Sequence, residues 1–175
     1  MILQTSNPDI FLRPFGYDDA RDVSRIGNNR NIWLNVRDQF PHPYREQDAI
    51  NFVKMIKEND KDHVMVIIYH NNIVGVTGLH VQSDVYSHSA ELGYFIDEAF
   101  WNKGIASTVV KRMVSYGFEI LNLHRIFASV FAHNTASMKV LEKSGFIKEG
   151  IKKDGAIKDG KIVDEHCFGI INQSI

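Results

Sequence analysis

Two strand-like segments joined by a pair of asparagines are the feature that most restricts the fold of this 175-residue chain. HVMVIIYH (63–70) and IVGVTGLHV (73–81) are rich in β-branched residues, which favour strands. Asn71-Asn72 between them suits a tight turn, because asparagine tolerates the left-handed backbone conformation that two-residue hairpin loops need. The sequence therefore predicts a β-hairpin, and with it a sheet, in the middle of the chain.

Segments with strand and helix patterns surround this hairpin. Five further strands are predicted from short apolar or alternating runs in residues 10–15, 90–97, 125–131, 145–153 and 161–171. Four helices are predicted from apolar residues three or four apart and from polar or glycine ends, in residues 17–29, 45–60, 105–121 and 134–146. This order predicts a mixed α/β fold with about seven strands.

Composition and charge exclude several classes of protein. With 20 basic against 21 acidic residues, the chain offers no basic surface for nucleic acid or an anionic membrane. No apolar run approaches the ~20 residues of a membrane span, and the first residues lack the pattern of a signal peptide. The length suits one domain over residues 1–175, and the single cysteine, Cys167, favours a reducing cytoplasm.

The stretch FWNKGIASTVVKRM (100–113) places one glycine at an expected turn from strand to helix. The free N–H groups at such a helix start can bind an anion. Gly104 lets the backbone approach closely and Lys103 adds positive charge, while Ala106 and Ser107 keep the first turn narrow. A diphosphate would fit there. The alternative is that Gly104 only permits a tight turn.

Other sites for phosphate or metal find less support. A dinucleotide fingerprint needs three glycines, and only Gly104 is present in the stretch. GAIKDGKI (155–162) matches G-x-x-x-x-G-K, but Ile162 replaces the Ser or Thr that would hold magnesium, so a hairpin loop is expected there. The eight histidines form no H-x-H or H-x-x-x-H pair, so no metal site is expected.

Long segments of the chain resemble one enzyme family. AELGYFIDEAFWNKGIAST (90–108) and LNLHRIFASVFAHNTASMKVLEKSGFIKEG (121–150) are similar to the GNAT superfamily of N-acetyltransferases, and specifically to its Rim-type branch of ribosomal-protein N-terminal acetyltransferases. The family's cofactor loop, Q/R-x-x-G-x-G/A, corresponds to residues 101–106, where Trp101 departs from the Gln or Arg. Residues 28–53 and 159–170 extend the resemblance over nearly the whole chain.

The resemblance implies both a fold and a reaction. It implies a mostly antiparallel seven-stranded sheet flanked by about four helices. The implied reaction is transfer of an acetyl group from acetyl-CoA to a primary amine by direct attack in a ternary complex, without a metal. The residues that it implies for binding acetyl-CoA are Phe95, Ile96, Asn102, Lys103, Gly104, Ile105, Ala106, Ser107 and Asn134.

Two residues are candidates for proton transfer. Glu91 is the candidate base, because it is a carboxylate in an otherwise apolar strand beside the expected thioester; the alternative is a structural role, such as orienting a loop. Many family members carry a Tyr as general acid seven residues after the Asn that corresponds to Asn134, but Leu141 stands there. Ser137, one helical turn after Asn134, is the expected substitute, with Tyr94 as a weaker candidate.

The acceptor and the assembly are less constrained. The loop between the first two predicted helices is expected to line the amine site with Trp33, Phe40, His42 and Tyr44, although Trp33 and Phe40 suit an ordinary core equally well. A protein N-terminal amine or a small-molecule amine is the expected acceptor. The apolar last strand allows a homodimer, and the absent Tyr leaves open a CoA-binding module without turnover.

Overall fold

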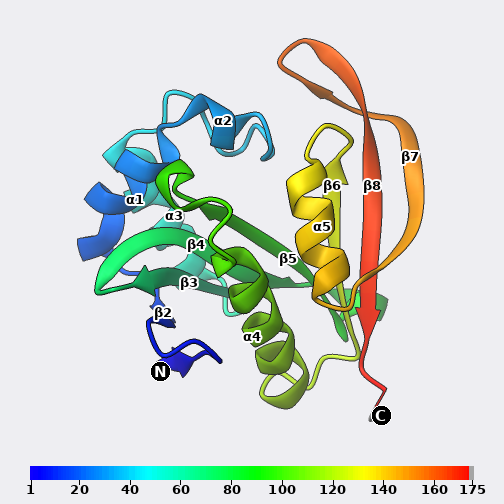
Figure 1. The fold of residues 1–175 in the computed structure, drawn as a ribbon, viewed down its shortest axis with the longest axis horizontal. Coiled ribbons are helices and arrows are strands. Elements are labelled where there is room, and N and C mark those ends of the chain that lie inside the picture. Colours follow the sequence, from blue (N-terminus) through cyan, green and yellow to red (C-terminus); the bar gives the residue numbers. More distant parts are fainter. Residues whose placement is uncertain (174–175) are drawn as a thin grey trace.

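The computed structural model describes residues 1–173, which form one eight-stranded sheet with helices on both faces (Figure 1). The strand order is β1-β2-β3-β4-β5-β6-β8-β7. The strands are β1 (Leu3–Gln4), β2 (Ile10–Pro14), β3 (Asp62–Tyr69), β4 (Asn72–Val81), β5 (Ser89–Ile96), β6 (Arg125–Phe131), β7 (Ile147–Lys158) and β8 (Lys161–Ile171). The α-helices are α1 (Ala20–Gly27), α2 (Arg30–Trp33), α3 (Glu46–Glu58), α4 (Ile105–Glu119) and α5 (Thr135–Lys143).

This architecture confirms the predicted α/β fold and adds two short elements to it. One is β1, a two-residue strand that pairs with β2. The other is α2, a single turn that begins because the side chain of Asn29 accepts hydrogen bonds from the amides of Asn31 and Ile32. Both elements are too short to produce a periodic sequence pattern, which explains why seven strands and four helices were predicted.

The predicted central hairpin is present, with its turn shifted by one residue. Tyr69 pairs with Asn72, so the two turn residues are His70 and Asn71, with φ angles of 47° and 64°. Positive φ at both positions is the geometry that matches the twist of the flanking strands. The pairing also shifts by one between Ile67 and Ile68, and that bulge moves the turn back along the sequence.

The two faces of the sheet bury different cores. Helices α4 and α5 cover one face, and the buried residues there include Leu92 and Ile96 of β5. Helices α1 and α3 cover the other face, where Phe95 packs with Val76 and Tyr44. Because neighbouring residues of a strand point to opposite faces, β5 contributes to both cores. Strand β5 is therefore held rigidly from both sides.

One pair of neighbouring strands separates along its length. Strands β5 and β6 are the only parallel pair in the described sheet, and their pairing runs from Ser89–Arg125 to Glu91–Phe127. Beyond that point β5 continues along β4 as far as Ile96, while β6 continues along β8 (Figure 1). The carboxyl-terminal halves of β5 and β6 therefore border an opening in the sheet.

The chain ends in a long hairpin at the edge of the sheet. Strand β7 extends beyond the predicted segment 145–153 to Lys158, so most of the predicted loop is strand. The turn at its tip uses Asp159 and Gly160, with φ angles of 52° and 72°. In Figure 1 the tip lies at the same end of the molecule as α2.

Candidate active site

The main-chain groups of β5 divide between β4 and the opening. The amide of Asp97 donates to the carbonyl of Val74 at 2.8 Å, and at the other end the amide of Gln82 donates to the carbonyl of Ser89 at 2.9 Å. In an antiparallel pair, every second residue of a strand directs its N–H and C=O groups toward the same neighbour. Phe95 lies two residues before Asp97 and six after Ser89, so its main chain also faces β4. The main-chain groups of Tyr94 and Ile96 consequently point toward β6, whose pairing has already ended.

This alternation changes one expectation about the cofactor-binding residues. The sequence prediction gave both Phe95 and Ile96 main-chain contacts to the cofactor. In the structure the main chain of Phe95 faces β4 and its ring packs toward α1 and α3, whereas the main chain of Ile96 faces the opening. The carbonyl of Ile96 accepts a hydrogen bond from the indole of Trp101 at 2.8 Å, which ties the next loop to the end of β5.

Helix α4 begins at the edge of this opening. Gly104 is its N-cap residue with a φ of 76°, and no atom lies within 4 Å of the position that a Cβ would take. Asn102 also has a positive φ, 60°. The first amides of α4 have no acceptor within the helix, so they are available to an anion. The side chain of Ile105 is buried in the core, so only its main chain is available to a ligand at this helix start.

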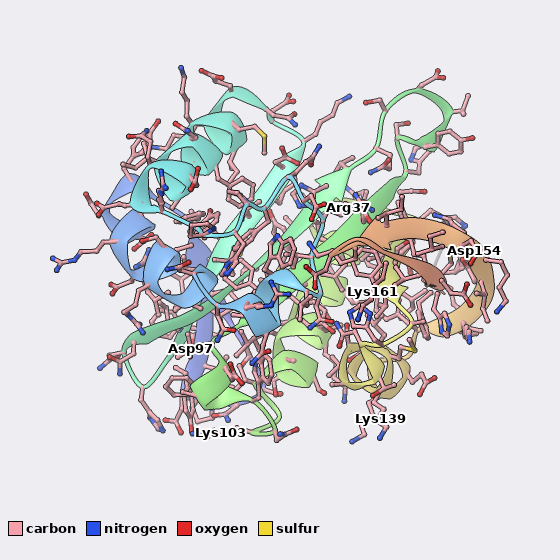
Figure 2. All side chains as sticks on the ribbon, turned by 90° about the horizontal axis from the view of Figure 1, so that it is seen from above. Arg37, Asp97, Lys103, Lys139, Asp154 and Lys161 are labelled. Atoms are coloured by element: carbon pink, nitrogen blue, oxygen red, sulfur yellow. The ribbon has the colours of Figure 1, made fainter. Side chains whose placement is uncertain are left out.

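Lys103 lies in the exposed loop that leads to α4. Its ammonium is 4.8 Å from the centre of the Phe100 ring, a cation–π contact that restrains the side chain. Figure 2 shows Lys103 at the outer edge of the molecule. The loop thus combines exposed positive charge, open backbone and free helix amides, as an anion site requires.

Two hydroxyl groups meet between β5 and α5. The Tyr94 Oη and Ser137 Oγ atoms are 2.8 Å apart, and either can be the donor. The amide of Ser137 donates to Asn134 Oδ1 at 3.1 Å, so Asn134 caps α5. Burial raises the pKa of Tyr94 to about 12, and the hydrogen bond to Ser137 opposes that rise. Tyr94 is therefore a neutral hydrogen-bond donor at physiological pH. Leu141 is fully buried in the core.

Glu91 is the last residue of β5 that pairs with β6, and its carboxylate contacts Arg37. Both guanidinium Nη atoms bind it, one at 3.1 Å from Glu91 Oε2. Arg37 belongs to the segment of residues 34–45 between α2 and α3, which we call the acceptor loop. The contact corresponds to the loop-orienting role considered for Glu91. The sequence gave no signal for Arg37, because the pair joins residues 54 apart.

The four aromatic residues predicted to line the amine site form two separate groups. Phe40 stacks on Tyr44 with ring centres 4.1 Å apart and meets the edge of Phe95 at 5.2 Å. Tyr44 is 4% exposed and lies in the core under α1 and α3. His42 stacks on Trp33 at 5.7 Å and is exposed. Trp33 and His42 are therefore the accessible pair.

Among residues 1–173, no group of three or more His, Cys, Asp or Glu side chains is placed to hold a metal ion. Within the same residues, no helix is long and apolar enough to cross a membrane.

Comparison with known proteins identifies the family. The sequence profile of the "Acetyltransferase (GNAT) domain" matches residues 9–147. Spermidine N(1)-acetyltransferase of Vibrio cholerae is 31% identical over 145 residues, which cover 82% of each chain. The structure of spermidine N-acetyltransferase from Vibrio cholerae with CoA and spermine aligns at 26% identity with a TM-score of 0.82, over 94% of this chain and 96% of that chain. Mycobacterium smegmatis RimJ with CoA-disulfide shares the fold, with a TM-score of 0.84 at 24% identity over 95% of this chain and 83% of that chain.

The opening between β5 and β6, the helix that starts at Gly104 beside it, and the similarity to these proteins together indicate an acetyltransferase. The chain belongs to the GNAT acetyltransferase family. This confirms the predicted GNAT family. It also confirms the predicted enzyme class and cosubstrate: the protein is an acetyl-CoA-dependent N-acetyltransferase that acts on amines.

The raised pKa of Tyr94 predicts a loss of stability at alkaline pH. The folded state holds this proton more tightly than the unfolded chain, whose tyrosine pKa is about 10. The contribution to stability is therefore complete below pH ~10 and is lost as pH rises from there to about 12. Urea denaturation across this range should show wild type losing up to about 1.4 kcal/mol per pH unit more than Tyr94→Phe. If the free energy of unfolding of the two proteins fell equally with pH, the raised pKa of Tyr94 would be contradicted.

Proposed function

We propose that the opening between β5 and β6 binds acetyl-CoA, with residues 102–107 at its diphosphate. The observation that carries this proposal is the coincidence of two features at one place. The β5–β6 pairing ends at Glu91–Phe127, and α4 presents its free amides beside the gap behind an open, left-handed Gly104. The amides of the pantetheine arm can then pair with the main chain of Tyr94 and Ile96 as a strand would. Asn134 is the proposed side-chain donor to the same arm.

In this arrangement the acceptor amine attacks the thioester carbonyl directly. The C–N bond forms, the C–S bond breaks and the thiolate takes a proton from Ser137, which regains one from Tyr94; Tyr94 is then reprotonated from water, and the proton that the amine loses leaves through Glu91. The 2.8 Å contact between these hydroxyls supports the relay, and the raised pKa keeps Tyr94 protonated. Glu91 is the proposed base for the amine, acting through water, and its contact with Arg37 also orients the acceptor loop.

The Gly104→Val variant tests the binding site. A β-branched side chain strongly disfavours a φ of 76°, so the loop must change conformation and the amides lose their alignment. Since the surroundings of Gly104 are open, the domain should still fold. Isothermal titration calorimetry is expected to show loss of acetyl-CoA binding, with an unchanged circular dichroism spectrum.

Gly160→Val is the matched control. Gly160 has a similar φ of 72° and equally open surroundings, but it lies at the tip of the β7–β8 hairpin. This variant should bind acetyl-CoA as wild type does. Normal binding by Gly104→Val would overturn the assignment of the helix start to the diphosphate.

Ser137→Ala tests the proton donor. Removing the hydroxyl should slow the chemical step by about 10- to 100-fold, because the thiolate must then be protonated by water. The affinity for acetyl-CoA should stay within about twofold, since Ser137 is not assigned to cofactor binding. Rapid-quench measurement of a single turnover separates the two effects. A wild-type rate would leave Ser137 with a structural role.

The charges on the acceptor side favour an acceptor with one amine. Glu91 is paired with Arg37, Glu165 with Lys152 at 2.8 Å and Asp38 with a lysine of β7 at 2.5 Å. These three carboxylates are neutralised within the chain, so none of the three is free for the second and third ammonium groups of a polyamine. We therefore propose a single primary amine, as in a peptide N-terminus, although the Vibrio cholerae relative is a spermidine acetyltransferase.

A panel of acceptors tests this choice. Thiol release from acetyl-CoA is measured with Ser-Gly-Ala amide, n-butylamine and spermidine. The peptide is expected to give a kcat/KM about tenfold or more above that for spermidine. Faster turnover of spermidine would reject the single-amine proposal and leave the cosubstrate site intact. Glu165→Gln removes one carboxylate from this side of the opening and serves as a control. The peptide should remain a better acceptor than spermidine in this variant.

We also infer that the protein forms a homodimer through its last hairpin and works in the cytoplasm. Ile157 and Ile162 are a cross-strand pair, 69% and 65% exposed, and Ile151 on the same face is 42% exposed. Three large apolar side chains in one exposed row favour burial against another surface. The support for a cytoplasmic location is the single cysteine, Cys167.

A further inference from the structure

Lys158, the last residue of β7, has a buried side chain. It is 3% exposed, and its ammonium lies 2.5 Å from Asp38 Oδ1 and 3.7 Å from the centre of the Trp33 ring. An ammonium taken out of water is costly unless charge and geometry compensate for the lost hydration. Here one carboxylate and one aromatic face supply that compensation, and both belong to the α2 region rather than to the hairpin.

The turn beside Lys158 adds a second contact to the same region. Asp159 pairs with Arg30 of α2 at 2.7 Å, and the Arg30 guanidinium lies 5.5 Å from the Trp33 ring centre. The Trp33 ring thus contacts two cations, and His42 stacks on it.

Two adjacent residues of the acceptor loop are held from opposite sides. Arg37 binds Glu91 of β5, and Asp38 binds Lys158 of β7. Strands β6 and β8 lie between β5 and β7 in the sheet, so the loop spans the side of the opening opposite α4 and α5. His133, just after β6, adds a hydrogen bond from its Nε2 to the carbonyl of Leu34 at 3.0 Å.

We propose that Lys158 is a positioning residue that anchors the acceptor loop and so sets the affinity for the acceptor amine. It acts through Asp38 and Trp33 and has no contact with the helix start assigned to acetyl-CoA. The inference rests on the proposed function, because that proposal assigns the acceptor to this side of the opening. An exposed ion pair would hold the loop only weakly. The buried ammonium of Lys158 favours the one loop conformation in which Asp38 and Trp33 contact it.

Lys158→Met is the central variant. Methionine keeps the unbranched apolar stem and removes the charge, and Asp38, whose side chain is 67% exposed, is left in water at little cost. The variant should therefore fold. We expect the KM for Ser-Gly-Ala amide to rise about tenfold and the Kd of acetyl-CoA to stay within about twofold. Hydrogen exchange of the amides in residues 34–45 should become faster.

Asp38→Asn provides an independent test of the same contact. It leaves the ammonium of Lys158 without its carboxylate, so the lysine should move to water and unseat the hairpin tip. This single variant should loosen the loop more than Lys158→Met does. The double variant should match Lys158→Met, because the buried charge is then absent.

Trp33 supplies a spectroscopic readout. The chain has two tryptophans, so a Trp101→Phe background leaves the emission of Trp33 alone. Loss of the ammonium 3.7 Å from its ring should change that emission in Lys158→Met. Lys153→Met is the matched control, since Lys153 forms an exposed pair with Asp164 on the same hairpin. It should leave the emission, the exchange rates and both binding constants unchanged.

The possible outcomes separate this inference from the proposed function. An unchanged acceptor KM and unchanged exchange in Lys158→Met would overturn the anchoring role, as would an equal loss of acetyl-CoA affinity. If wild type fails to acetylate any acceptor, the proposed acceptor site is wrong. Exchange and emission would then still show whether Lys158 anchors the loop.

Discussion

The proposed active site depends on the point at which β5 and β6 stop pairing. Each of these strands keeps a full partner on its other side, β4 for β5 and β8 for β6, so the separation costs hydrogen bonds at one edge only. Unpaired edges of a sheet normally attract another strand. In this protein the two edges face each other inside the fold, where a linear substrate with amide groups can take the place of the missing strand. Because the chain belongs to the GNAT family, acetyl-CoA is the substrate that we propose for this place.

Local sequence patterns were sufficient for most of the fold. The central hairpin, the amphipathic α4 and the asparagine start of α5 each follow from residues that are neighbours in the chain. The turn into a helix at Gly104 was predicted for the same reason, and the structure adds that Gly104 is left-handed there. The errors in the fold were also local. Strand β1 and helix α2 are too short for periodicity, and a bulge at Val74 of β4 moved one turn by a residue.

Contacts between distant segments could not be predicted in this way. Arg37 with Glu91 and Lys158 with Asp38 join residues 54 and 120 positions apart, and charged residues of both signs are common along the chain. The direction of each main-chain group in β5 also depends on the register with β4, which the sequence does not specify. That register assigns the opening to Tyr94 and Ile96, whereas the sequence alone suggested Phe95 and Ile96.

These two kinds of information divide the site into a cofactor half and an acceptor half. The proposed cofactor half uses backbone geometry around Gly104 and β5, which tolerates many side chains and so is compatible with Trp101 in place of the family's Gln or Arg. The acceptor half is assembled by ion pairs from α2, β5, β7 and β8. A single charge change there alters the loop without disturbing the sheet. If the proposed acceptor loop selects the amine, relatives with one fold can differ in acceptor through changes in these ion pairs alone.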